Sequence, residues 1–394
     1  MNSIVTPARN AAEALSGRFA RKQSGWSEKL VLSVLNALER YLFTDNFVVA
    51  NQTPYTEILR DDIMFVRHYL PLEDDTIQVG DVRIPVRRER HRTPLVLVPP
   101  LAATAMIFDL LPQRSVVRYF LAQGYDVYLI DWGEVTESHA DLSLSTYVLD
   151  WMPQALEAVR RQSGERDVSV FAYCMGGLLT LMYAAASGDP HLRNIVTVAS
   201  PVDMHQSGLA GRLLSFVYRP AQLISRVLNF SLMDLPSRYL HVPGWLNALT
   251  FKLTNPLGSV ISTLELLVNL WDREYLKEHT TMSLWFDDMV DYPGATVKEM
   301  VSKMMLSNQM ARGRMKLGDR EARFNEIRAS ILAFAGDDDK LVSPEAAHKV
   351  LDIVASEDKE FCVVPGGHAG VFAGSKAPEH TWAIAAQWLA ARSD

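Results

Sequence analysis

Apolar residues in the chain recur with two different periods, and the change from one to the other divides the sequence. In residues 26–43 the apolar positions follow helical spacing, and short strands are expected between this helix and residue 92. From Thr93 onward, short and almost unbroken apolar runs alternate with helical segments. Residues 1–92 are therefore predicted to be a covering segment of helices and strands beside a core that begins at residue 93.

The alternation after Thr93 predicts a mostly parallel sheet with helices on both faces. Nearly continuous apolar strands separated by helices are typical of such sheets, because both faces of the sheet are buried. The predicted strands are 95–98, 126–130, 168–171, 194–199, 330–335 and 360–364, and the predicted helices are 115–123, 147–162, 178–186, 344–353 and 379–391.

The alternation stops between residues 201 and 328. This stretch is helical in pattern, rich in Leu, Phe, Trp and Met, and interrupted by prolines. We predict an inserted helical cap, because one interrupted sheet explains the pattern more economically than two consecutive domains. The core then consists of a first part, 93–200, and a second part, 329–394.

Composition restricts the class of protein. The chain has 394 residues, of which 48% are hydrophobic and 22% charged, as in globular proteins with a large core. Its net charge of -7 argues against nucleic acid as a partner, and no apolar run is long enough for a membrane span or a signal peptide. Its two cysteines, Cys174 and Cys362, are too far apart in sequence for a disulfide framework or a zinc motif. We expect a cytoplasmic protein without a metal or cofactor.

One cysteine occupies a special position. The strand 168–171 continues into Ala172-Tyr173-Cys174-Met175-Gly176-Gly177 and then into an apolar helix, which puts Cys174 at the apex of a tight turn. The nucleophile elbow of α/β-hydrolases has this arrangement of small residues two positions before and after the nucleophile, because the strained turn leaves no room for bulk. We therefore predict the α/β-hydrolase fold, with a thiol in the nucleophile position.

The environment expected for Cys174 favours reactivity. A buried cysteine is usually a compact apolar residue, which is our interpretation of Cys362. Cys174, in contrast, would lie at a helix N-terminus, where the helix dipole lowers the pKa of a thiol. The N–H of Met175 would point to the place where an oxyanion forms.

An acid and a histidine should follow later strands of this fold, in that order. After strand 330–335 the chain carries three consecutive carboxylates, Asp337, Asp338 and Asp339. Asp339 is preferred because it is closest to the apolar pair 341–342, which is expected to anchor the loop; the other two are competing assignments, and a plain acidic turn is the simplest alternative. His368 follows strand 360–364 in a loop of small residues. We predict a triad of Cys174, His368 and Asp339.

Such a triad suits acyl transfer. The base takes the proton of the thiol and later returns it, and the carboxylate fixes the imidazole tautomer. A thiolate that attacks an acyl thioester forms a new thioester, so the acyl group stays activated on the enzyme. This chemistry suits onward transfer of the acyl group and also permits its hydrolysis.

Several stretches of sequence carry a resemblance to a known family. They are Val98-Pro99-Pro100, Asp109-Leu110 with Arg114-Ser115, residues 124–133 ending in Asp131-Trp132-Gly133, the elbow 173–177, Asn308 and Gly313, residues 339–344 and residues 367–371. With them the chain resembles the polyhydroxyalkanoate synthases, in particular the short catalytic subunits of the two-subunit class III type. The resemblance implies a template-independent polymerase that loads the acyl group of an (R)-3-hydroxyacyl-coenzyme A on Cys174 and elongates a polyester, with His368 as base and Asp339 as its support. It also implies a second synthase subunit or a homodimer, and association with polymer granules.

The chain departs from the pattern of this family at three places. Leu101-Ala102-Ala103-Thr104 stand where family members often carry an Asn and a basic residue, and Leu101 is the expected position of a second oxyanion donor or substrate contact. Lys340 replaces a histidine that often follows the acid, and Ala172 replaces the first glycine of the elbow. The cap residues 202–283 match only weakly, so a divergent enzyme is expected.

Two other functions are compatible with the sequence. An intracellular polyester depolymerase or an acyl thioesterase would use the same triad but admit water to the acyl-enzyme. A non-catalytic protein would bind polymer granules or membranes through the apolar cap segments 213–232 and 260–271, which more simply are helices packed over the core. For the enzyme, we expect the cap to cover Cys174 and to shift when substrate enters.

Overall fold

The computed structural model describes residues 25–208, 232–253 and 256–393. These residues belong to two compact units. The larger unit is formed from Ala50–Thr254 and Trp285–Asp394, and the smaller unit from Met1–Val49 and Asn255–Leu284. The predicted boundaries at residues 92, 200 and 328 differ from this division, since both the N-terminal segment and the cap contribute to both units.

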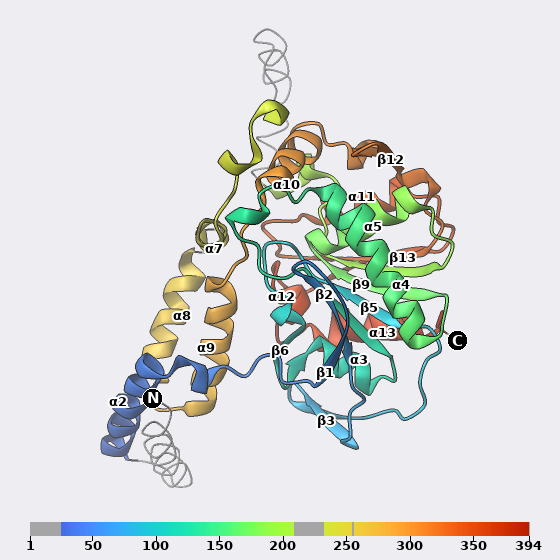
Figure 1. Cartoon of the computed structure of the whole chain (residues 1–394). Helices are drawn as coiled ribbons and strands as arrows, with labels where there is room; N and C mark the ends of the chain where they lie inside the picture. Colours follow the sequence, from blue (N-terminus) through green and yellow to red (C-terminus); the bar gives the residue numbers. More distant parts are fainter. Residues whose placement is uncertain (1–24, 209–231, 254–255, 394) are drawn as a thin grey trace. The chain divides into compact units, whose positions relative to one another are not determined.

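An eight-stranded, mostly parallel sheet forms the centre of the larger unit (Figure 1). The strand order is β1-β2-β8-β5-β9-β10-β13-β14; the six strands from β8 onward are parallel, and β1 and β2 are antiparallel. The predicted mostly parallel sheet is confirmed. The strands are β1 Tyr55–Asp61, β2 Met64–Tyr69, β5 Leu95–Val98, β8 Val127–Asp131, β9 Val168–Tyr173, β10 Leu192–Val198, β13 Ser330–Gly336 and β14 Lys359–Val364.

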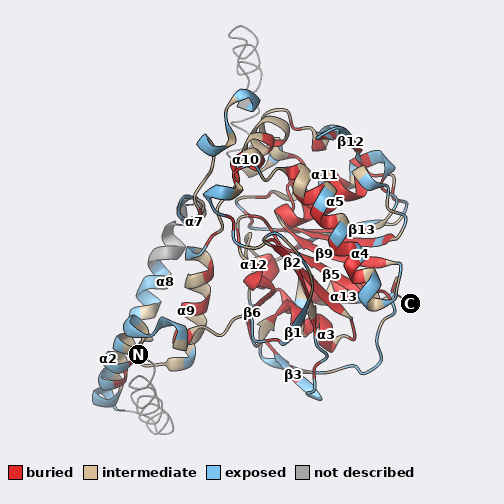
Figure 2. Ribbon diagram, in the orientation of Figure 1, coloured by how far each residue is buried: buried red, intermediate tan, exposed pale blue. Residues whose placement is uncertain are grey.

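Helices cover both faces of this sheet. Val170 and Ala172 of β9 belong to a buried cluster with residues of α4 and α5, whereas the intervening Phe171 packs against Phe120 of α3 and Phe372 of α12. Successive side chains of a strand point to opposite faces, so both faces of β9 are covered. Figure 2 shows that the central strands and α5 are buried. The helices are α3 Val116–Ala122, α4 Met152–Ser163, α5 Met175–Ser187, α11 Pro344–Ile353, α12 Gly370–Ala373 and α13 Ala383–Ala390.

Some elements differ from the sequence prediction. The β1–β2 hairpin does not form a separate covering layer, because β2 pairs with β8 and extends the main sheet. The inserted region is not wholly helical either, since it contains the hairpin of β11 Arg314–Leu317 and β12 Arg320–Arg323. Unlike the unbroken apolar run of β5, these partly exposed strands of four residues are too short for periodicity to distinguish them from helical turns. Two further small sheets pair β3 Thr76–Val79 with β4 Val82–Pro85 and β6 Asp109–Leu111 with β7 Arg114–Ser115.

The smaller unit is helical. It contains α2 Trp26–Leu42, α8 Pro256–Val268 and most of α9 Arg273–Asp287. Arg273 forms two hydrogen bonds with Glu39, at 2.6 and 2.8 Å, and Asn36 donates to the carbonyl of Leu270 at 2.8 Å. The predicted helix 26–43 is confirmed, but its partners come from the region predicted as the cap.

The rest of the inserted region lies in the larger unit and includes α7 Gly244–Leu253 and α10 Gly294–Glu299. Val242 and Tyr292 form an isolated antiparallel bridge, and the N–H of Val290 donates to the carbonyl of Ala102 at 2.9 Å. Part of the inserted region therefore contacts the loop after β5. Most of the apolar segment 213–232 lies outside the described residues. Among the helices that are described, none has both the length and the apolar composition needed to cross a bilayer.

Candidate active site

Cys174 lies at the apex of the turn between β9 and α5. Its φ is +51°, in the left-handed region that residues with a side chain rarely adopt. The N–H of Cys174 donates to the carbonyl of Val198 at 2.8 Å, and its carbonyl accepts a hydrogen bond of 2.8 Å from Oγ of Ser200. Contacts with the end of β10 therefore hold this strained residue on both sides.

Close backbone packing explains the small residues around Cys174. A Cβ atom at Gly176 would lie 2.3 Å from the carbonyl oxygen of Val98, and one at Gly177 would lie 2.1 Å from Oγ of Ser200. Ala172, which replaces the usual glycine, is fully buried. Its methyl group is accommodated in the core, so this departure from the family pattern leaves the turn intact.

His368 and Asp339 meet beside this turn. Nδ1 of His368, in the loop after β14, lies 2.8 Å from Oδ2 of Asp339, in the loop after β13. Oδ1 of Asp339 accepts hydrogen bonds from the N–H groups of Leu341, at 2.8 Å, and Val342, at 2.9 Å. The side chain of Asp339 is 0% exposed and that of His368 9%. A buried carboxylate held in this way fixes the orientation of an imidazole.

The other two carboxylates of the loop have different partners. Oδ1 of Asp337 accepts a hydrogen bond of 2.9 Å from the N–H of Gly366, which ties this loop to the histidine loop. Asp338 forms an exposed ion pair with Lys340. Of the three assignments that the sequence leaves open, Asp339 is the one that the structure brings to His368.

Cys174 and His368 interact through charge and through a side-chain hydrogen bond. Burial alone would lower the pKa of His368. The negative charge of Cys174 and the hydrogen bonds to Asp339 and Cys174 outweigh burial and raise the pKa of His368 to about 10. The three residues thus form one contiguous array, in the order Cys174, His368, Asp339.

Met175, whose N–H is predicted as an oxyanion donor, and Leu101, predicted as a second oxyanion donor or a substrate contact, lie next to the elbow. Met175 begins α5, and the first N–H groups of an α-helix have no partner within the helix. Leu101 belongs to the same buried cluster as Met175, and its N–H donates to no other described residue. The carbonyl of Pro99, two residues before Leu101, packs against Gly176. The N–H groups of Met175 and Leu101 are therefore available to donate hydrogen bonds to an oxygen atom of a bound molecule.

Two tyrosines beside the thiol were not indicated as functional by the sequence. Tyr173 directly precedes Cys174, and its hydroxyl donates to the carbonyl of His368 at 3.1 Å. Burial and then the charge of Cys174 raise the pKa of Tyr292, so its phenol lies within electrostatic reach of the thiol. Local patterns do not encode either proximity, because one depends on the packing of a distant loop and the other on the bridge from Tyr292 to Val242.

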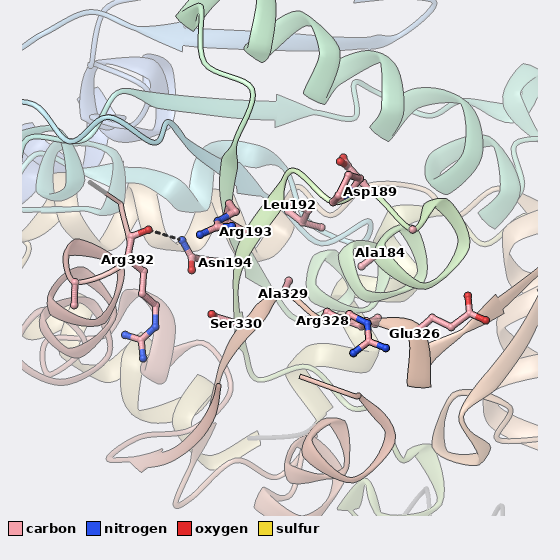
Figure 3. A pocket seen from close by; sticks show the side chains of 14 residues that line it. Ala184, Asp189, Leu192, Arg193, Asn194, Glu326, Arg328, Ala329, Ser330 and Arg392 are labelled. Atoms are coloured by element: carbon pink, nitrogen blue, oxygen red, sulfur yellow. Dashed lines mark hydrogen bonds between the residues drawn. The ribbon is translucent and has the colours of Figure 1, made fainter. Parts of the chain in front are cut away.

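A cavity of about 810 Å³ lies elsewhere in the larger unit (Figure 3). It is lined by Leu192 and Ser330, the first residues of β10 and β13, whereas the candidate site follows the carboxyl ends of strands. Several charged groups there already have partners, since Asp189 pairs with Arg160 at 2.6 Å and Arg392 pairs with Asp358 at 2.7 Å. Nothing in its lining matches the chemistry assembled around Cys174.

Comparisons with known proteins agree with this architecture. A family model described as serine aminopeptidase, S33, matches residues 113–371. The chain is 28% identical to the poly(3-hydroxyalkanoate) polymerase subunit PhaC of Haloferax mediterranei over 349 residues, which are 88% of this chain and 66% of that protein. It is also 28% identical to the subunit of the same name from Allochromatium vinosum over 303 residues, 76% of this chain and 81% of that protein.

A solved structure also shares the fold. A soluble variant of the monoglyceride lipase from Saccharomyces cerevisiae, in complex with a substrate analog, matches with a TM-score of 0.53 and 12% identity. The match covers 88% of this chain and 97% of that chain. At this level of identity the likeness concerns the fold alone, and with the family model it confirms the predicted α/β-hydrolase fold.

The relatives confirm the resemblance to polyhydroxyalkanoate synthases and the expectation of an enzyme, because they are named polymerases. The family model covers more than half of the chain and includes Cys174, Asp339 and His368. The chain therefore belongs to the family described as serine aminopeptidase, S33, within the α/β-hydrolases.

Proposed function

We propose that this chain is an acyltransferase that polymerises (R)-3-hydroxyacyl-coenzyme A into polyhydroxyalkanoate through an acyl group bound to Cys174. The observation that carries the proposal is the contiguous array of Cys174, His368 and Asp339 at a nucleophile elbow. The relatives named poly(3-hydroxyalkanoate) polymerases support the choice of substrate and reaction.

In the first step, His368 takes the proton of the Cys174 thiol, and the thiolate attacks the thioester carbonyl of the substrate. The N–H groups of Met175 and Leu101 stabilise the negative charge that develops on the carbonyl oxygen. Coenzyme A leaves as a thiol with the proton that His368 held. The acyl group is then bound to Cys174 as a new thioester.

In the second step, the chain grows. The 3-hydroxyl of an incoming acyl-coenzyme A gives its proton to His368 and attacks the thioester on Cys174. An ester bond forms, and the sulfur of Cys174 leaves and regains the proton from His368. The extended chain, now on coenzyme A, returns to Cys174 by another thioester exchange, which frees coenzyme A. Asp339 keeps the imidazole in place throughout.

Burial of the site favours transfer over hydrolysis. The side chains of Asp339 and His368 have little exposed surface, and Tyr292 of the inserted region lies near Cys174. Exclusion of water protects a reactive acyl intermediate from hydrolysis. We infer that the inserted region covers Cys174 and shifts to admit the coenzyme A thioester.

We also propose that the protein works with a second synthase subunit or a second copy of itself, at the surface of a polymer granule. The word "subunit" in the names of the relatives supports a partner. Several large apolar side chains of α2 are exposed, which supports an apolar contact surface. They include Trp26, which is 95% exposed, and Leu30, Val34, Leu38 and Tyr41.

The test is to incubate the purified protein with (R)-3-hydroxybutyryl-coenzyme A and to measure released coenzyme A, insoluble polymer and free acid together. Peptide mapping by mass spectrometry then locates the acyl adduct, with a Cys362→Ala variant as the control. Polymer together with an adduct on Cys174 supports the proposal. Free acid without polymer would identify a hydrolase instead, and no release of coenzyme A with no adduct on Cys174 would contradict an enzymatic role.

A further inference from the structure

Tyr173 connects the two loops that carry the proposed nucleophile and base. Tyr173 is the last residue of β9, is 2% exposed, and is covalently joined to Cys174. Its hydroxyl donates a hydrogen bond of 3.1 Å to the backbone carbonyl of His368. The side chain of Tyr173 therefore connects the residue next to Cys174 to the main chain of His368.

Aromatic contacts hold the ring of Tyr173 in place. It stacks on Phe372 of α12 with a centroid distance of 4.3 Å and an interplanar angle of 21°. Its centroid also lies 5.4 Å from that of the His368 imidazole. Phe372 in turn packs edge-on against Phe108 at 4.8 Å. A tyrosine side chain has two rotatable angles, so a clamped ring makes a rigid spacer.

The hydroxyl of Tyr173 is a hydrogen-bond donor across the pH range in which the protein works. Burial, and then the negative charges of Cys174 and Asp339, hold the pKa of Tyr173 well above its ordinary value. The backbone carbonyl of His368 can only accept a hydrogen bond. The contact therefore persists without any change of protonation.

We propose that Tyr173 is a positioning residue, whose hydroxyl holds the main chain of His368 at the distance at which the imidazole meets the thiol of Cys174. Asp339 orients the ring through Nδ1, but it does not hold the backbone of the histidine. Gly366 and Gly367 precede His368, and without the tyrosine hydroxyl this glycine-rich loop has more freedom to move. This inference rests on the proposed roles of Cys174 and His368.

The test compares two variants that each lose one buried phenol hydroxyl. Tyr173→Phe keeps the ring and its stacking but removes the hydrogen bond to His368. The matched control is Tyr125→Phe, because Tyr125 is also 2% exposed and its hydroxyl also donates to a backbone carbonyl, that of Ala386, at 2.8 Å. Tyr125 precedes the amino end of β8, whereas Cys174 follows the carboxyl end of β9. Both variants should lose similar folding stability.

The main readout is the rate at which iodoacetamide alkylates Cys174, followed by mass spectrometry from about pH 5 to about pH 10. The Cys362 peptide serves as an internal reference. Loss of one hydrogen bond should lower the alkylation rate of Cys174 at neutral pH by about three- to tenfold in Tyr173→Phe, and shift its pH profile upward. Turnover of 3-hydroxybutyryl-coenzyme A should show kcat lowered by a similar factor with KM unchanged. Tyr125→Phe should match the wild type in each readout.

The proposal is overturned if Tyr173→Phe alkylates at the wild-type rate while its stability falls as much as that of Tyr125→Phe, because the hydroxyl is then merely structural. A second variant, Phe372→Leu, removes the stacking partner and keeps the hydroxyl. Because the stacking only helps to hold the ring, its alkylation rate should fall less than that of Tyr173→Phe, and an equal or larger loss would assign the effect to aromatic packing instead. Failure of the proposed function has a different signature: the wild type alkylates rapidly and His368→Gln slowly, but substrate leaves no acyl adduct on Cys174.

Discussion

Nδ1 of His368 lies 2.8 Å from Oδ2 of Asp339, between two loops that follow neighbouring parallel strands. Both acceptor atoms of Asp339 are in use, since its other oxygen receives the N–H groups of Leu341 and Val342. The carboxylate therefore has one fixed orientation, and so does the imidazole. Because both side chains are held in place, the contribution of each one to activity or stability can be measured with a variant that changes only that residue.

Substitution of the proposed nucleophile should abolish acyl transfer. In Cys174→Ala we expect the release of coenzyme A to fall by about a thousandfold or more, because loss of a nucleophile removes the covalent route altogether. Cys362→Ala is the control, since burial and then the charge of Glu360 raise the pKa of the Cys362 thiol. Steady-state assays of coenzyme A release would check this, and a Cys174→Ala protein with near-normal turnover would eliminate the covalent mechanism.

The two carboxylates Asp339 and Asp337 should respond differently to the same substitution. Asp339→Asn can keep its contacts with the loop N–H groups but no longer supports an imidazolium, so kcat should fall by about 10³- to 10⁴-fold. Asp337→Asn keeps an oxygen for the N–H of Gly366, and its kcat should change by less than about tenfold. Kinetic assays of both variants decide the assignment, which is reversed if Asp337→Asn is the more damaged enzyme.

The raised pKa of His368 predicts how stability depends on pH. Although burial opposes it, the charge of Cys174 and the contacts with Asp339 raise the pKa of His368 to about 10 in the folded protein, from about 6.5 in an unfolded chain. Protonated His368 thus stabilises the fold below about pH 6.5, and this contribution is lost as the pH rises through about 10. We expect the unfolding free energy of wild type minus that of His368→Gln to shrink by at least about 1 kcal/mol over this range.

Denaturant unfolding at a series of pH values would measure this difference. Cys174→Ala provides the control, because it removes the largest cause that raises the pKa of His368, and its stability should depend less on pH. A difference between wild type and His368→Gln that stays constant from pH 6.5 to 10 would contradict the ion pair.

Close packing at the elbow predicts a penalty for a single methyl group. In Gly176→Ala the new Cβ would lie 2.3 Å from the carbonyl oxygen of Val98, so the elbow or β5 must shift. We expect a loss of about 1–3 kcal/mol in unfolding free energy and a strong loss of Cys174 acylation. Gly25→Ala, where a Cβ meets open space, should change stability by less than about 0.5 kcal/mol. Equal stability of the two variants would show that the backbone at the elbow can adjust.

Much of the sheet was predictable because its signals are local. Strand β5 has the predicted bounds, since it is a short apolar run buried on both faces, and helix α11 begins at Pro344, where Ser343 caps the first turn. In contrast, the contact between Arg273 and Glu39 joins residues that are 234 positions apart, and no local pattern predicts it. Periodicity also does not predict the π-helical turns at Thr146–Trp151 and Pro378–Trp382, which precede α4 and α13.

The candidate site was predictable for the same reason. Cys174, Asp339 and His368 each follow a strand that can be recognised from its apolar residues, and parallel strands bring their carboxyl ends to one edge. The approach of Tyr292 to the thiol and the bond from Tyr173 to His368 depend on how distant loops pack. Periodicity carries no information about such contacts.

Cys174, Asp339 and His368 follow strands β9, β13 and β14, respectively. The inserted region, in contrast, lies in the sequence between β10 and β13. The reacting groups and the region proposed to admit substrate are thus encoded in separate stretches of the gene. Exchange of the insertion for another would therefore leave the proposed nucleophile, base and acid in place and change only the proposed route by which substrate enters.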